Sequence, residues 1–185
     1  MTTIRLVIKK SAVLLALFGV LLMPSTVFAS PFGHGKFGAD VPFGSATSIS
    51  INLGGNVQLP LAPDGNNFKG TGSHTVTVTS TDVVGYYLYS HTTGSSSMTS
   101  GGASIPASSN SSAAPLSVGS WGYNLTGSTT DFIGLASTSS LLVDAVGPYK
   151  NGNPTTVTYG ALAPATQEAG TYSVAVTYTA VAKNQ

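Results

Sequence analysis

From Ala46 onward, apolar and polar residues alternate with a period of two. The alternation is clearest near the end of the chain, from Tyr172 to Ala180, where aromatic, apolar and small residues alternate with Ser173, Ala175, Thr177 and Thr179. In a β-strand, successive side chains point to opposite faces, whereas a helix places residues about 3.6 positions apart on one face. The same pattern recurs at Ile49–Leu53, Thr75–Thr79, Tyr86–Leu88, Trp121–Leu125 and Val157–Tyr159. The chain therefore predicts half-buried strands and no helix after residue 46.

Turn-forming residues separate these runs. They include Gly54-Gly55-Asn56, Asp64-Gly65-Asn66-Asn67, Asn151-Gly152-Asn153-Pro154 and Ala169-Gly170. Short strands at such spacing are typical of an antiparallel β-sandwich. We predict an all-β domain of about eight or nine strands, immunoglobulin-like or jelly-roll-like, over residues 45–183. Residues 92–117 are rich in serine, glycine and alanine, and predict a long loop with one short strand near Ala103–Pro106.

The first 29 residues have the features of a cleavable signal peptide. Arg5, Lys9 and Lys10 precede an apolar run, and Ala29 ends a segment with small residues at the positions that signal peptidase reads. The apolar run is shorter than the ~20 residues that a membrane span needs. We expect cleavage after Ala29 and a secreted or extracellular protein, with an uncleaved anchor as the alternative.

Removal of this signal changes the charge of the chain. Three of the seven basic residues lie in the signal, which leaves four against six acidic residues and a net charge of −2. Binding to nucleic acid or to an anionic membrane needs clustered lysine and arginine. We therefore expect neither as a partner, and no stable membrane insertion after cleavage. The absence of cysteine favours a bacterial exported protein slightly.

Residues 30–44 form a separate leader in which Phe-Gly occurs three times. The phenylalanines are Phe32, Phe37 and Phe43. Closely spaced glycine disfavours regular helix and weakens a strand. One interpretation is a flexible spacer, and the other is an interaction arm whose phenylalanines dock on a neighbouring subunit.

The sequence contains few groups that could carry out catalysis. His34, His74 and His91 are separate, with the latter two expected at strand ends, and no Gly-x-Ser-x-Gly nucleophile pattern occurs. The six acids are also scattered, so no pair marks a glycosidase. Asp64-Gly65-Asn66-Asn67 lacks the spacing of a calcium loop and predicts a turn. We expect no enzyme activity, no cofactor and no metal.

Three segments between about Thr75 and Val181 together resemble exported bacterial surface β-sandwich domains. They are Val84-Gly85-Tyr86-Tyr87-Leu88, Ser120-Trp121-Gly122-Tyr123 with Asp131–Leu135, and Val157–Gly160 with Ala169–Ala180. The closing Gly-Thr-Tyr strand is similar to the last strand of the WxL cell-wall-associated family. That family's Trp-x-Leu motif is replaced here by Tyr178-Thr179-Ala180. The resemblance implies the fold and a cell-surface location, but not attachment to peptidoglycan.

Two functions are compatible with these features. The first is a structural or interaction protein of the cell surface, such as a fibre or matrix subunit that binds copies of itself. The second is a non-catalytic module that binds glycan or cell wall through aromatic residues. Tyr87 and Tyr89 are expected on the face opposite Tyr86 and Leu88, where they could stack on a sugar. Trp121 could contribute to such a platform, although burial preferences favour a place in the core.

Overall fold

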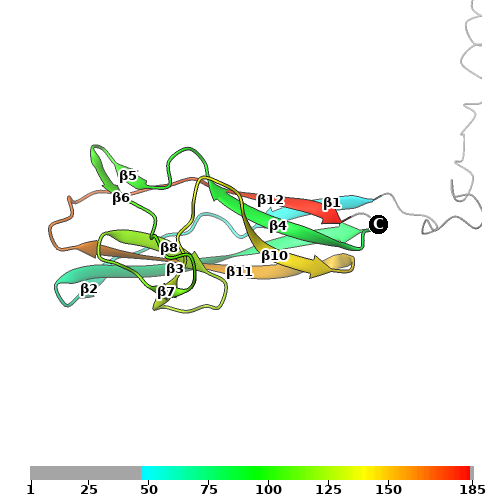
Figure 1. Ribbon diagram of the computed structural model, residues 1–185, viewed down its shortest axis with the longest axis horizontal. Coiled ribbons are helices and arrows are strands. Elements are labelled where there is room, and N and C mark those ends of the chain that lie inside the picture. The colour runs from blue at the N-terminus through cyan, green and yellow to red at the C-terminus, as the bar shows by residue number, and fades with distance from the viewer. Residues whose placement is uncertain (1–46, 184–185) are drawn as a thin grey trace, which may run out of the picture. The chain divides into compact units, whose positions relative to one another are not determined.

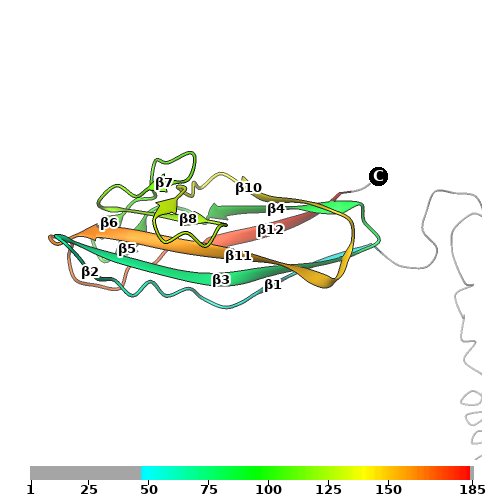
Figure 2. The ribbon, with the colours of Figure 1, turned by 90° about the horizontal axis from the view of Figure 1, so that it is seen from below.

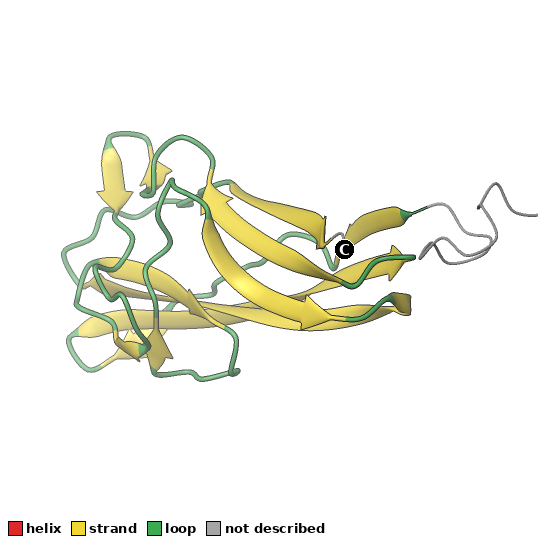
Figure 3. Ribbon diagram, turned by 45° about the vertical axis from the view of Figure 1, so that its right-hand side comes forward, coloured by secondary structure: helices red, strands yellow, loops and turns green. Residues whose placement is uncertain are grey.

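The computed structural model describes residues 47–183, and these residues form an antiparallel β-sandwich (Figures 1 and 3). The predicted all-β fold is confirmed. The predicted signal peptide and leader lie outside the described residues. Residues 47–183 form twelve strands rather than eight or nine, because five of the strands contain only two or three residues.

The larger sheet has five strands in the order β1-β3-β11-β8, with β2 also paired to β3. Their bounds are β1 Ser48–Leu53, β2 Ala62–Asp64, β3 Asn67–Thr81, β8 Ser120–Asn124 and β11 Tyr149–Pro164. The two longest strands, β3 and β11, pair from Asn67 opposite Pro164 to Val78 opposite Asn153. Strands β2 and β3 are joined by the predicted Asp64–Asn67 turn, where Gly65 has a φ of 60° that glycine adopts without strain.

The smaller sheet has three strands in the order β10-β4-β12. They are β4 Gly85–Thr92, β10 Ser140–Val146 and β12 Val176–Lys183. Strand β12 begins four residues after the expected start at Tyr172, although Tyr172 and Val174 still pack against the core. Figure 2 shows the two layers, with β4 and β12 in one and β3 and β11 in the other.

Four short strands form two small pairs outside these sheets. Strand β5 (Met98–Ser100) pairs with β6 (Ala103–Ile105), and β7 (Ala114–Pro115) pairs with β9 (Asp131–Phe132). The predicted strand near Ala103 is therefore present, but residues 92–117 are more ordered than the expected long loop. Their backbone pairs with β8, since Ser108 N–H donates to the Trp121 carbonyl at 2.7 Å.

The core lies between the inner faces of the two sheets. Its largest fully buried apolar side chains are Trp121, Tyr86, Leu88, Ile105, Leu135, Val76, Val78 and Val157. Burial of each such side chain contributes about 1.5–3 kcal/mol. The core thus supports a domain without disulfides.

Candidate interaction sites

Strand β4 carries two tyrosines on the outer face of the smaller sheet. Tyr86 and Leu88 are fully buried beneath the sheet, and Tyr87 and Tyr89 between and beyond them are half-buried on the opposite face. The rings of Tyr87 and Tyr89 lie 6.1 Å apart at 45°. The alternation of β4 alone predicts this placement, and the structure agrees.

The neighbouring strands extend this aromatic surface on both sides. Tyr87 lies between Asp144 of β10 and Val181 of β12, and Tyr89 lies next to Leu141. Leu141 and Val181 are 49% and 46% exposed. We call the surface formed by Tyr87, Tyr89, Leu141 and Val181 the aromatic face.

A single ion pair borders the aromatic face. The Lys183 ammonium group pairs with the Asp144 carboxylate and lies 4.4 Å from the centre of the Tyr87 ring. The lysine charge is thereby neutralised, and the ammonium group makes a cation–π contact with one side of that ring. The aromatic face is therefore apolar with polar edges. Such a surface can stack against the apolar side of a sugar ring or against another protein.

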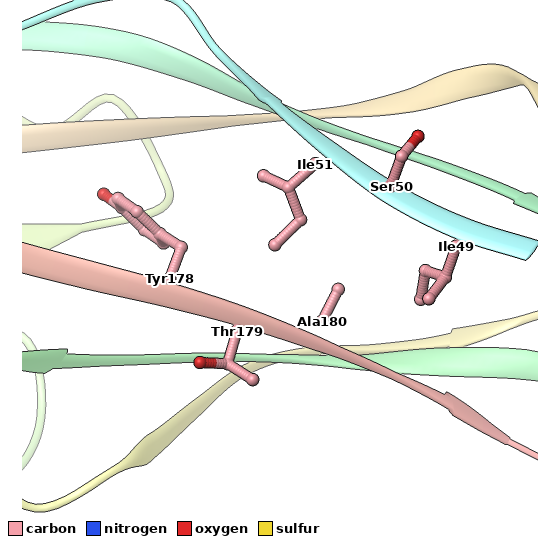
Figure 4. Close-up of a pocket in the computed structure, with 6 residues that line it drawn as sticks. All are labelled: Ile49, Ser50, Ile51, Tyr178, Thr179 and Ala180. Carbon is pink, nitrogen blue, oxygen red and sulfur yellow. The ribbon is translucent and has the colours of Figure 1, made fainter.

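A second candidate site is an apolar groove between strand β1 of the larger sheet and strand β12 of the smaller one. The groove is open to solvent, has a volume of about 350 Å³ and is lined by Ile49, Ser50, Ile51, Tyr178, Thr179 and Ala180. In Figure 4, Ile49 and Ile51 point from β1 towards the Tyr178 and Ala180 side chains of β12, while Ser50 and Thr179 point away. We call this site the edge groove.

Both strands of the edge groove are sheet edges. Strand β1 pairs only with β3, and β12 pairs only with β4, among residues 47–183. Each therefore has one row of backbone N–H and C=O groups that no strand of the described domain uses. Such unpaired rows are able to accept an added strand.

Beside the groove, three side chains connect the two sheets through hydrogen bonds. His74 Nδ1 lies 3.0 Å from the Gly55 carbonyl oxygen, His74 Nε2 lies 2.8 Å from the Tyr178 hydroxyl, and that hydroxyl is bonded to the Tyr159 hydroxyl. A carbonyl only accepts, so neutral His74 donates from Nδ1 and accepts from Tyr178 at Nε2. Tyr178 in turn accepts from the Tyr159 hydroxyl.

We interpret the hydrogen bonds of His74, Tyr178 and Tyr159 as structural rather than catalytic. Burial raises the pKa of the Tyr178 hydroxyl far above its usual range, and the neighbouring Tyr159 adds to the effect. Burial also raises the pKa of Tyr159. Both hydroxyls thus stay protonated at neutral pH and act as hydrogen-bond donors. No local sequence pattern indicates this contact. The expected place of His74 at a strand end was wrong, because His74 lies within β3.

Trp121 does not contribute to either surface. Its side chain is 0% exposed, and its indole N–H donates to the Ser96 carbonyl oxygen at 2.9 Å. The interpretation of Trp121 as an exposed platform residue is wrong, because β8 is covered on both sides and Trp121 fills the core. Phe32, Phe37 and Phe43 lie outside the described residues.

Neither a metal-binding cluster nor a membrane-spanning helix occurs among residues 47–183. No group of three or more histidine, cysteine, aspartate or glutamate side chains in this part of the chain is placed to hold a metal ion. Within the same residues, no helix is long and apolar enough to span a membrane.

The chain was compared with family models, curated proteins and solved structures, and none of the three comparisons gave a match.

Proposed function

We propose that this chain is an exported structural or interaction protein of the bacterial cell surface that assembles with further copies of itself. The observation that carries this proposal is the pair of unpaired strand edges, β1 and β12, on either side of the apolar edge groove. Strand addition at a sheet edge provides both backbone hydrogen bonds and side-chain pockets. A rigid sandwich with such an edge suits a fibre or matrix subunit.

The predicted export signal and the resemblance to surface sandwiches of the WxL type support a location outside the membrane. The proposal involves no catalytic step, cofactor or nucleic acid. It places the leader, residues 30–44, between the export signal and the sandwich as the segment available for contact with a neighbour.

The direct test is the size distribution of residues 30–185, measured by light scattering on a sizing column. A version that begins at residue 45 is the comparison. Large species for the longer form and monomers for the shorter form would support assembly through the leader. Monomers for both forms across the whole range of protein concentrations measured would refute the proposed self-assembly.

The aromatic face favours a second function, which is binding to a cell-wall glycan. Tyr87 and Tyr89 present two ring systems 6.1 Å apart on a solvent-facing sheet, next to exposed Val181. Stacking of an aromatic ring on a sugar uses this kind of surface.

Co-sedimentation with purified cell wall measures this second function. Replacement of Tyr87 and Tyr89 by alanine should abolish binding, whereas replacement of Val118 by alanine should leave it unchanged. Val118 is the control, because it is an exposed apolar residue outside the aromatic face. Equal binding by both variants would reject the aromatic face as a glycan site.

A further inference from the structure

The open backbone groups of the edge groove can be assigned from the hydrogen bonds at the ends of β12. The Ala175 carbonyl accepts from Thr93 N–H at 2.9 Å, and the Lys183 carbonyl accepts from Val84 N–H at 3.3 Å. Backbone groups alternate between the two sides of an antiparallel strand, so odd-numbered residues of β12 bond to β4. The N–H and C=O groups of Val176, Tyr178 and Ala180 therefore face the open side.

The same reasoning applies to β1. Gly54 N–H donates to the Thr75 carbonyl at 2.9 Å, so even-numbered residues of β1 bond to β3. Ile49 and Ile51 turn their backbone groups to the open side. The apolar side chains of both strands line the groove at these same positions, and the groove thus offers a hydrogen-bonding edge and an apolar floor together.

A segment of the leader has the pattern that such a groove requires. Residues 37, 39, 41 and 43 are Phe, Ala, Val and Phe, while residues 36, 38, 40, 42 and 44 are Lys, Gly, Asp, Pro and Gly. In extended conformation, one face of residues 37–43 is entirely apolar and the other is polar or small. This register separates Phe37 and Phe43, which share the apolar face, from Phe32, which lies outside it.

The extended length of this segment also matches the length of strand β12. Seven residues in extended conformation span about 23 Å at ~3.3 Å per residue. Strand β12 has eight residues, so the segment can pair along most of its length. Pro42 lacks an N–H group but belongs to the even-numbered set. Pairing with β12 through the odd-numbered residues therefore loses no donor to proline.

We propose that residues 37–43 of one copy insert as a strand into the edge groove of a second copy, with Phe37, Ala39, Val41 and Phe43 against its apolar floor. The assignment depends on the proposed function, since it names the site and the partner through which copies assemble. Strand β1 begins at the end of the sandwich where β12 finishes, because Ser48 pairs with Thr81 and Lys183 with Gly85 (Figure 1). A leader attached at that end suits a head-to-tail contact, in which the surface that donates differs from the surface that accepts.

A donor-defective variant removes the apolar face of the segment. The double substitution Phe37→Ser and Val41→Ser should abolish the large species formed by residues 30–185. The matched control is Lys36→Ser with Asp40→Ser, which has the same spacing on the opposite face and leaves the net charge unchanged. The control should assemble like the unsubstituted protein.

An acceptor-defective variant blocks the groove while retaining the leader. Ala180→Pro removes an N–H group that faces the open edge and is not used in pairing with β4. The substitution should therefore abolish assembly and leave the urea unfolding midpoint close to that of the unsubstituted protein. If the proline lowers that midpoint, Ala180→Trp is the alternative acceptor-defective variant, because its side chain fills the groove. Val181→Ala, on the outward face of β12 and outside the lining of the groove, is the control.

Mixing the two defective variants gives the decisive result. Each alone should be monomeric, and together they should form 1:1 dimers and nothing larger, since only one intact donor and one intact groove remain per pair. Large species that persist in both variants would overturn this inference but leave assembly through another surface, and thus the proposed function, in place. Two monomeric variants that fail to form a dimer would also overturn it. A monomeric unsubstituted protein would refute both proposals.

Discussion

Replacement of Gly160 by alanine tests whether a pair of glycines makes room for the Phe132 ring. Gly160 of β11 lies opposite Gly122 of β8; the Phe132 ring packs over Gly160 and the Phe132 Cβ atom over Gly122. A Cβ atom at Gly160 would lie 2.3 Å from Phe132 Cζ and 2.6 and 2.7 Å from its two Cε atoms. Optimal carbon–carbon contacts are ~3.5–4.0 Å, so the ring would have to move by more than 1 Å.

The expected change in the free energy of unfolding is the difference between two opposing effects. Overpacking of a buried site costs about 1–3 kcal/mol, and Phe132 is 0% exposed. Alanine at a compatible backbone position gains about 0.4–1 kcal/mol, because the unfolded chain has fewer conformations to lose. We expect Gly160→Ala to lower the free energy of unfolding by about 1–2 kcal/mol.

The assay is urea unfolding of four proteins: the unsubstituted chain, Gly160→Ala, Phe132→Leu and the double variant. Leucine lacks the three ring atoms that the new methyl group would meet, so Gly160→Ala should be neutral or stabilising in the Phe132→Leu background. Gly102→Ala is the control for the loss of a glycine, because a Cβ there meets no atom within 4 Å. The same loss of stability from Gly160→Ala in both backgrounds would refute the steric explanation.

Three further predictions concern stability. The buried Thr92 hydroxyl has no hydrogen-bond partner among the described residues. Thr92→Val should therefore raise the free energy of unfolding by about 1 kcal/mol. An unchanged or lower urea midpoint would contradict this prediction. The raised pKa of Tyr178 contributes stability that is fully present below the ordinary tyrosine pKa of ~10 and is lost as the pH rises above it. Urea midpoints should therefore fall above about pH 10, and fall less steeply in Tyr178→Phe; equal slopes would count against the buried hydroxyl as the cause. Asp144→Asn breaks a partly exposed ion pair with Lys183. It should change the free energy of unfolding by less than about 1 kcal/mol in low salt. A larger change would indicate a wider charge network.

The strands that the sequence predicts best are those with one buried and one exposed face. On β4 the alternation identifies the buried residues correctly, including the placement of Tyr87 and Tyr89 outside the core. On β12 it identifies Val176, Tyr178 and Ala180 as the residues that pack against the core, where they are partly buried. Strand β8 has no such alternation in burial, because the segments around Ala107 and Ile133 pair with its second edge and Phe132 packs over Gly122. Alternation alone does not indicate these contacts, so the sequence was compatible with Trp121 in the core or at the surface.

The candidate sites could be predicted from the sequence less well than the strands, because each site joins residues from distant parts of the chain. The aromatic face joins β4 with β10 and β12, and the edge groove joins β1 with β12, strands that are far apart in the chain. A period of two assigns each side chain to a face of its own strand, but does not state which strands are neighbours. The contact of His74 with Tyr178 spans 104 residues and had no local signal for the same reason.

The sequence by itself therefore determined the all-β class, the antiparallel sandwich and the inner and outer faces of its alternating strands. These properties follow from the local geometry of a strand and the burial of apolar side chains. The tertiary structure alone decided which edges remain unpaired and which side chains from distant strands meet. Those outcomes depend on the order of strands in each sheet, which is fixed by the packing of the whole domain rather than by any single segment.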